Sequence, residues 1–259
     1  MIGFYVKKAF WDGWDNVLTL AVFNLGHVLV GSVAFFLPSI LGARPFVVML
    51  CIGGGILGLS VWQAAAAFTM RKIADFGTPS LRESLDSFAM AWKPGLALGA
   101  ALVIILFSII VGIPFYLSRG GFLGVMLASL LFWTCLVLLL AAQYFLPLVA
   151  RRGGSLRKNA RHALILLADN PGFSFFLLLY HLATILISVL MAFLLPGLAG
   201  IALGGADAVR LRLKKYEWLE QNPGADRKNP PWDSLLEEDR ALIGKRTLKG
   251  MIFPWKDGQ

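Results

Sequence analysis

Residues 122–152 read FLGVMLASLLFWTCLVLLLAAQYFLPLVARR, and this stretch decides the fold class. The 29 residues from Phe122 to Ala150 carry no charged side chain. A helix needs about 20 apolar residues to cross the roughly 30 Å of hydrocarbon in a bilayer. We therefore predict a membrane-spanning helix here. The Arg151-Arg152 pair that follows marks its cytoplasmic end, because short loops rich in Lys and Arg stay on that side.

Five further apolar runs accompany this one. Four are long enough to span a bilayer: Val17–Leu37, Phe46–Met70, Leu96–Leu117 and Phe173–Leu195. The fifth, Pro196–Leu213, is shorter and contains Asp207 and Arg210, so it spans only if both charges reach the interface. The whole chain is 58% hydrophobic and 15% charged, whereas soluble domains carry about 25% charged residues. The sequence predicts an all-α polytopic membrane helical bundle with six spans.

The distribution of basic residues predicts the orientation. Of the 24 Lys and Arg residues, only Arg44 and Arg119 fall on one side of the apolar runs, and the other 22 fall on the opposite side. The positive-inside rule places that basic side, with both chain termini, in the cytoplasm. This anchoring role accounts for the net charge of +9, so nucleic acid is not expected as a partner.

Two segments on the inner side have the pattern of amphipathic surface helices. In the first, Ser80-Leu-Arg-Glu83 is a capping box, and Leu81, Leu85, Phe88 and Trp92 follow at helical spacing until Pro94-Gly95. The second begins at Ser155-Leu-Arg157 and ends at Pro171-Gly172. The shared Ser-Leu-Arg to Pro-Gly pattern leaves two interpretations open, an internal duplication or a coincidence.

The chain divides into a membrane domain, residues 1–215, and a polar cytoplasmic tail, residues 216–259. Ser234-Leu-Leu-Glu237 is a further capping-box pattern and predicts one short helix that ends near Gly244. The apolar cluster at residues 251–255 includes Phe253 and Trp255. It either packs back onto the inner face of the membrane domain or docks on a partner.

Polar side chains within the apolar runs are candidates for function, because they are costly in hydrocarbon. These are Asn24, His27, Gln63, Gln143 and His181. Hydrogen bonding between helices is the favoured interpretation, and a polar path for a small solute is the alternative. For Asp207 we expect a helix cap or an ion pair with Arg210.

The basic cluster after residue 150 is expected to contact anionic lipid, as clustered Lys and Arg do at the inner leaflet. Its members are Arg151, Arg152, Arg157, Lys158 and Arg161.

No motif supports enzymatic, metal or cofactor chemistry. Gly244-Lys-Arg-Thr247 has the end of a P-loop, but Asp239 stands where its first glycine belongs. The three histidines lack metal-ligand spacing, and no nucleophile-elbow motif is present. We expect a protein that is not an enzyme and that holds no metal or cofactor.

One combination of features resembles a known family. It comprises Phe23-Asn24-Leu25, the run that ends in Leu37-Pro38, a second span rich in small residues with a basic exit, and the surface helix from Leu81 to Trp92. Together they resemble the YesL-like family of bacterial integral membrane proteins, over about residues 10–100 and more loosely to 213.

The resemblance implies a multi-pass protein of the bacterial cytoplasmic membrane. The family has no established activity, and its members are often found beside carbohydrate ABC-importer components. It therefore implies an accessory or partner subunit with ABC-importer subunits as candidate partners. A small-solute channel or secondary transporter is the alternative.

Overall fold

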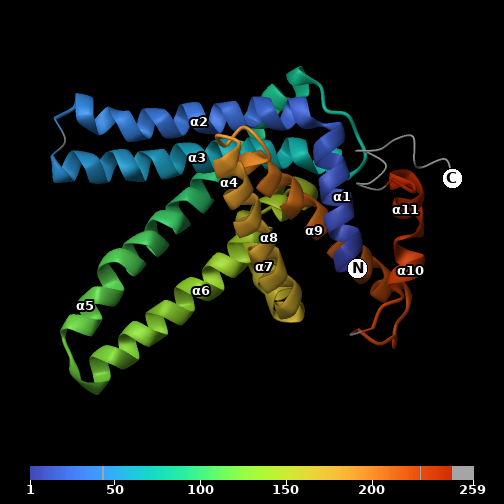
Figure 1. The fold of residues 1–259 in the computed structure, drawn as a ribbon. Coiled ribbons are helices and arrows are strands. Elements are labelled where there is room, and N and C mark those ends of the chain that lie inside the picture. Colours follow the sequence, from blue (N-terminus) through green and yellow to red (C-terminus); the bar gives the residue numbers. More distant parts are fainter. Residues whose placement is uncertain (43, 228, 247–259) are drawn as a thin grey trace.

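The structure is a computed structural model that describes residues 1–42, 44–227 and 229–246. This part of the chain folds into helices joined by turns, with no strand among them (Figure 1), which confirms the all-α class. The elements are α1 (Ile2–Asp15), α2 (Val17–Ile40), α3 (Pro45–Ala74), α4 (Leu81–Phe107), the π-helix η1 (Ser108–Gly112), α5 (Ile113–Ser118), α6 (Gly121–Arg152), α7 (Leu156–Asp169), α8 (Pro171–Leu190), α9 (Gly197–Gln221), α10 (Trp232–Leu235) and α11 (Glu237–Ile243).

Five helices in the described residues are long and apolar enough to cross a membrane, as expected for a multi-pass membrane protein. They are α2, α3, the continuous α4–η1–α5 helix, α6 and α8. The sixth predicted span forms the first part of α9, which is not among the five. Instead α9 is the central helix of the protein, with Ala199, Leu203, Val209 and Leu211 buried against its neighbours. Six spans therefore stay a prediction.

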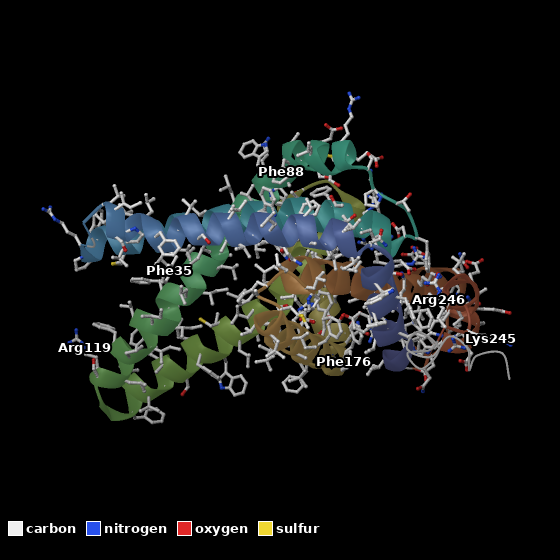
Figure 2. All side chains as sticks on the ribbon, turned by 45° about the horizontal axis from the view of Figure 1, so that its top comes forward. Phe35, Phe88, Arg119, Phe176, Lys245 and Arg246 are labelled. Atoms are coloured by element: carbon white, nitrogen blue, oxygen red, sulfur yellow. The ribbon has the colours of Figure 1, made fainter. Side chains whose placement is uncertain are left out.

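Two long helical hairpins give the protein its shape. One is α2–α3, and the other is α4–α5 with α6; their far ends diverge in both views (Figures 1 and 2). The hairpins meet where α3 crosses α4. Gly95 permits this crossing, because a Cβ atom there would lie 2.5 Å from the Cα of Val61. Gly99 faces Leu57 in the same way, so the Gly95-xxx-Gly99 pair brings two helix backbones close together.

The two ends of the molecule differ in charge. Arg119 lies at the far tip of the α5–α6 hairpin, and Lys245 and Arg246 lie at the opposite end of the molecule (Figure 2). The N-terminal helix and the tail are joined there: Lys7 Nζ donates to Gly244 O at 3.0 Å, and Arg246 pairs with Asp15 at 2.6 Å. Both termini of the described chain thus lie at the same, basic end.

The first predicted surface helix begins as expected but does not end as expected. Ser80 and Glu83 form the capping box, with Glu83 N donating to Ser80 Oγ at 3.2 Å. The helix then runs through Pro94 and Gly95 into the third span, so the prediction that it ends there is wrong. A proline removes only one helical hydrogen bond, and the close contact with α3 holds the helix together at this point.

The side chains that this segment buries also differ from the predicted apolar stripe. The residues buried against the protein are the small ones, Ser84, Ser87 and Ala91, whereas Leu85 and Trp92 are exposed. Leu85 and Trp92 therefore face the surroundings, whereas Phe88 packs against Trp62 of α3 with ring centroids 4.8 Å apart. The second segment, α7, does end before Pro171, at Asp169, so the two similar sequences adopt different connections.

The tail also departs from its predicted pattern. Ser234 lies inside α10 and donates to Pro231 O, so it does not cap the following helix. That helix, α11, ends at Gly244 as expected. It packs on the membrane domain through Leu236 and Ile243, which are almost fully buried. The predicted boundary between residues 215 and 216 falls within α9, which continues to Gln221.

Candidate functional site

Asn24 of α2 makes three hydrogen bonds to the turn between α8 and α9. Asn24 is fully buried, and its Nδ2 donates to Leu194 O at 3.0 Å and to Pro196 O at 2.7 Å. Its Oδ1 accepts from the backbone N–H of Ala199 at 2.8 Å. One side chain therefore satisfies both sides of the turn, which a tight break between two apolar helices would otherwise leave unpaired.

This turn lies part of the way along α2, and not at its far end. Asn24 is seven residues after the first residue of α2, or about 10 Å along the helix. From Asn24 to Ile40 the helix extends for about 24 Å more. The α8–α9 hairpin therefore ends well short of the tip of the α2–α3 hairpin.

Gln63 and His27 lie close to the same turn. Gln63 Nε2 donates to Leu198 O at 3.1 Å. His27 Nδ1 donates to Phe23 O at 2.9 Å, the same carbonyl that accepts from Trp62 Nε1. Because a carbonyl can only accept, Nδ1 of His27 carries the proton, and its Nε2 is buried without a partner in the described chain.

Gln143 and His181 belong to other contacts. Gln143 Nε2 donates to Ser174 O near the start of α8, at 2.9 Å, and the adjacent Tyr144 hydroxyl lies 2.8 Å from Ser174 Oγ. His181 Nε2 is buried without a hydrogen-bond partner among the described residues. Three of the five predicted polar residues thus bind backbone carbonyls of α8 and α9 or of the turn that joins them. This supports hydrogen bonding between segments, and the solute path stays a prediction.

A charged network joins four helices, α3, α6, α9 and α11. Asp75, at the end of α3, accepts from Arg151 of α6 at 2.6 Å and from Arg210 of α9 at 2.5 Å. Arg210 also pairs at 2.9 Å with Asp239 of α11, which Lys214 approaches at 3.0 Å. These pairs hold the pKa of Asp75 and of Asp239 below the ordinary value despite burial.

Asp207 does not pair with Arg210, so the predicted pairing is wrong. It lies 3.1 Å from Lys8 of α1, and both side chains are fully buried. Lys8 also binds Asp12, one turn further along α1, and lies over the Phe76 ring. Two buried carboxyl groups therefore share one ammonium group. Burial and the charge of Asp207 raise the pKa of Asp12 to about 8, although Lys8 opposes the shift.

A polar cavity of about 450 Å³ lies between the α7–α8 turn, α9 and the loop before α10. We call it the cationic cavity; its lining residues are Ala168, Asp169, Asn170, Arg212, Lys215, Arg227, Pro230 and Trp232. Arg212 is 8% exposed and Lys215 is 7% exposed. Asn170 Oδ1 accepts from Arg212 at 3.0 Å and from Lys215 at 3.5 Å. Burial lowers the pKa of Lys215.

The predicted lipid-binding cluster has several different roles. Arg151 is used in the network at Asp75, and Arg152 Nη1 lies 3.1 Å from His162 Nδ1. Lys158 and Arg161 are exposed on α7. Contact of these residues with anionic lipid stays a prediction, and Phe253 and Trp255 lie outside the described residues.

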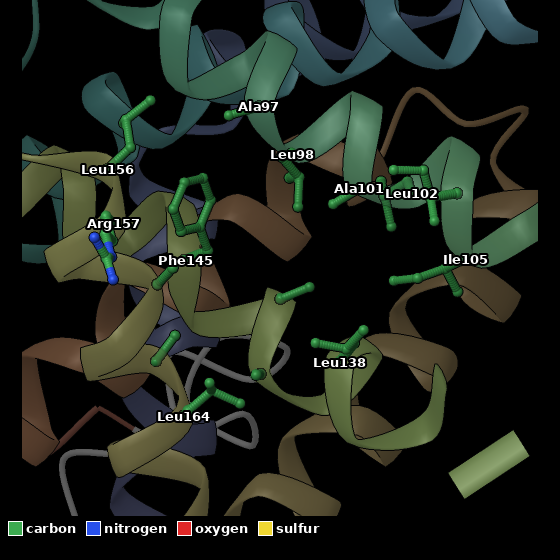
Figure 3. Close-up of a pocket in the computed structure, with 15 residues that line it drawn as sticks. Ala97, Leu98, Ala101, Leu102, Ile105, Leu138, Phe145, Leu156, Arg157 and Leu164 are labelled. Carbon is green, nitrogen blue, oxygen red and sulfur yellow. The ribbon is translucent and has the colours of Figure 1, made fainter. Parts of the chain in front are cut away.

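Arg157, the remaining member of that cluster, lines an apolar pocket of about 440 Å³ between α4, α6 and α7 (Figure 3). Leu98 and Ile105 of α4, Leu138 and Phe145 of α6, and Arg157 of α7 line it. Arg157 is the only charged residue among those that line it. The pocket therefore suits a hydrocarbon chain and offers no group for acid–base chemistry.

Sequence reasoning missed the residues of the cationic cavity and of the Lys8 cluster. From the sequence, Arg212 and Lys215 were interpreted only as charges that set the membrane orientation, although their spacing of three places them on one helix face. Lys8 and Asp12 are likewise four residues apart on α1, but only the fold brings Asp207 to them. Within the described residues, no three His, Cys, Asp or Glu side chains form a group that could hold a metal ion.

Comparison with known proteins gives no match. No family model matches the chain, and neither a curated protein nor a solved structure matches it. Membership of the YesL-like family therefore stays a prediction that rests on the short motifs alone.

Proposed function

We propose that this chain is a non-enzymatic partner subunit of another membrane protein in the bacterial cytoplasmic membrane. The observation that carries the proposal is the divergence of the α2–α3 and α5–α6 hairpins (Figure 1). Their far halves expose large apolar side chains, including Val33 and Phe36 on α2 and Leu130 and Trp133 on α6. Spanning helices associate through close packing, so these exposed apolar faces can pack against helices of a second protein.

The orientation follows from the charges. The basic end that carries α1, the network at Asp75 and the tail is placed in the cytoplasm by the positive-inside rule. The chain can return to this side in two ways. Either α8 and α9 both cross the bilayer, which gives six spans, or they form a re-entrant hairpin that enters and leaves the membrane on the cytoplasmic side. The position of the α8–α9 turn beside Asn24 favours the re-entrant arrangement.

The resemblance to the YesL-like family suggests carbohydrate ABC-importer subunits as the partner. Affinity purification of the full chain from native membranes in mild detergent tests this. We expect integral membrane subunits of an importer to co-elute at fixed stoichiometry. Elution of the chain alone, after crosslinking in the membrane as well as without it, contradicts the proposal.

Two glycine variants test whether the partner binds the face of α2 beside the α8–α9 turn. Gly31 lines a pocket of about 390 Å³ on α2 beside the α8–α9 turn, and a Cβ atom there meets nothing within 4 Å. Gly53 on α3 is equally open but does not line that pocket. We expect Gly31→Leu to lower the recovery of the partner at least fivefold and Gly53→Leu to leave it unchanged, with both variants folded.

The channel or transporter alternative has less support. It needs a continuous polar path, but Asn24, Gln63 and Gln143 are occupied by backbone carbonyls of the α8–α9 hairpin. Solute flux into vesicles that is lost in His27→Ala and His181→Ala would support the channel or transporter function.

A further inference from the structure

We propose that the cationic cavity binds a ligand through a phosphate group, with Arg212 and Lys215 as its principal contacts. The ligand is either an anionic phospholipid headgroup or a small phosphorylated solute. This site does not depend on the proposed role as a partner subunit.

The first argument is the charge of the lining. Three cations, Arg212, Lys215 and Arg227, line the cavity together with a single carboxylate, that of Asp169. Asp169 is already engaged, because it accepts from the Tyr216 hydroxyl at 3.0 Å and pairs with Arg227 at 3.4 Å. Within the described part of the chain, neither Arg212 nor Lys215 forms a direct ion pair with a carboxylate, although both are more than nine-tenths buried. Asp169 and Asp226 act on Lys215 only through their charge, and burial still lowers its pKa. A buried cation without an anion is costly, and a bound anion removes that cost.

The second argument is the orientation of Arg212. Its guanidinium lies over the Phe173 ring at 3.9 Å and over the Trp232 ring at 5.6 Å, which fixes its plane. Nη1 donates to Asn170, and Nε is buried with no partner in the described chain. The Nε side of an arginine is one of the edges that bind two oxygens of a phosphate or carboxylate at once. Arg212 is therefore held in place with a donor still unused.

The third argument is the start of α8. Asn170 is the N-cap residue of this 20-residue helix, but its side chain does not cap the helix. It binds Arg212 and the Tyr216 hydroxyl instead. Pro171, the first residue of α8, has no N–H, so only the N–H groups of Gly172 and Phe173 remain without a side-chain acceptor, next to Asn170, which lines the cavity. Backbone N–H groups and the helix dipole at an N-terminus favour an anion, and phosphate in particular.

The volume and place of the cavity limit the ligand. At about 450 Å³ it falls in the range of small-molecule sites. It opens at the basic end of the protein, where the inner leaflet meets the cytoplasm in the proposed orientation. A phosphate can therefore reach it from either side of that boundary.

The test uses the full chain, purified in a neutral detergent without phosphate. Calorimetry with inorganic phosphate and with glycerol 3-phosphate examines the soluble source. Native mass spectrometry of the protein from nanodiscs of phosphatidylglycerol or phosphatidylcholine examines the lipid source. We expect saturable binding of a soluble probe, or retention of phosphatidylglycerol over phosphatidylcholine.

Variants assign the binding to the cavity. We expect Arg212→Met and Lys215→Met each to weaken it at least tenfold. Arg161→Gln, which removes an exposed charge from α7 outside the cavity, should change it less than twofold. If either Met variant fails to fold, Arg212→Lys keeps the charge without the two-donor edge and should weaken binding severalfold.

Two outcomes overturn the proposal. One is that neither the soluble probes nor phosphatidylglycerol bind the wild-type protein in a saturable way. The other is that Arg161→Gln weakens binding as much as the cavity variants do, because binding is then an effect of general surface charge.

Discussion

Asp12 and Asp207 both approach the ammonium group of Lys8, although one cation can neutralise only one carboxylate. The second carboxyl group is therefore most stable in its protonated form, and burial raises the pKa of Asp12 to about 8. The ordinary value is about 3.9. A carboxyl group with a raised pKa contributes stability that is fully present below its unfolded pKa. That contribution is lost as the pH rises through the folded pKa.

The consequence can be measured with Asp12→Asn, which keeps the shape and removes the titration. We expect the melting temperatures of wild type and variant to be close at about pH 4 and below, where the unfolded carboxyl group is also protonated. At pH 9 the variant should be more stable by several degrees, because the wild type then carries a second buried charge. Asp15→Asn is the control, since Asp15 is half exposed and pairs with Arg246. Parallel melting curves for wild type and Asp12→Asn across this range would contradict the shared-cation account.

At the scale of elements, the crossing of α3 and α4 depends on Gly95. The Cβ of an alanine there would lie 2.5 Å from Val61 Cα and 2.9 Å from Ser60 O, both backbone atoms that cannot rotate away. We expect Gly95→Ala to destabilise the protein by about 2 kcal/mol, as overpacking does. Gly54→Ala on α3 meets nothing within 4 Å and should be neutral or stabilising. Thermal unfolding in detergent measures both, and equal effects would show that the crossing can relax.

The second prediction at this scale is that the α8–α9 turn lies within the membrane and does not reach its outer face. A single cysteine at Met191, in a background without Cys51 and Cys135, reports whether the turn reaches the outer face. We expect a membrane-impermeant maleimide added from outside to label Arg119→Cys, at the α5–α6 tip, and not Met191→Cys. Labelling of both at similar rates would show that α8 and α9 cross the whole bilayer.

At the scale of the whole molecule, the tail is tied to the membrane domain by Asp239. This carboxylate is 1% exposed and accepts from Arg210 and Lys214. We expect Asp239→Asn to weaken the docking of α11 by about 2 kcal/mol, because two cations then lose a buried partner. Hydrogen exchange should increase in residues 232–243 and stay unchanged in α2 and α3.

The exposed pair of Asp233 with Arg240 provides the control for this change. Asp233 is 94% exposed at its side chain, and surface pairs contribute little, so Asp233→Asn should leave exchange in the tail as it is. Since the pKa of Asp239 is below its ordinary value, the contribution of Asp239 is present at neutral pH. It is lost only as the pH falls through that lowered pKa.

Much of the fold could be predicted from local pattern. The starts and ends of α2, α3 and α6 lie within four residues of the predicted spans. The capping box at Ser80 and the end of α11 at Gly244 were also correct. Two local predictions failed. Pro94-Gly95 is a helix-breaking signal in isolation, but close packing against Val61 keeps the helix continuous. Ser234 is displaced from its capping position by the turn at Pro231.

The candidate sites could be predicted only in part. Asn24 was identified because a polar residue within an apolar run stands out by itself. Arg212 and Lys215 were not, because they lie among eleven basic residues that a simple topology rule already explains. Their distinguishing property is the absence of a direct ion pair with a carboxylate, which depends on how other segments, such as the α7–α8 turn at Asp169, pack against them.

Local sequence pattern alone predicts the all-helical class, the five helices that are long and apolar enough to span a membrane, and the asymmetry of charge. These follow from hydrocarbon thickness and the cost of burying charge, which act on each segment separately. The three-dimensional packing is needed to see that the sixth run becomes a buried central helix, that the turn before it lies beside Asn24, and which carboxylate pairs with which cation. These depend on distances between segments far apart in the chain, and no local pattern encodes such a distance.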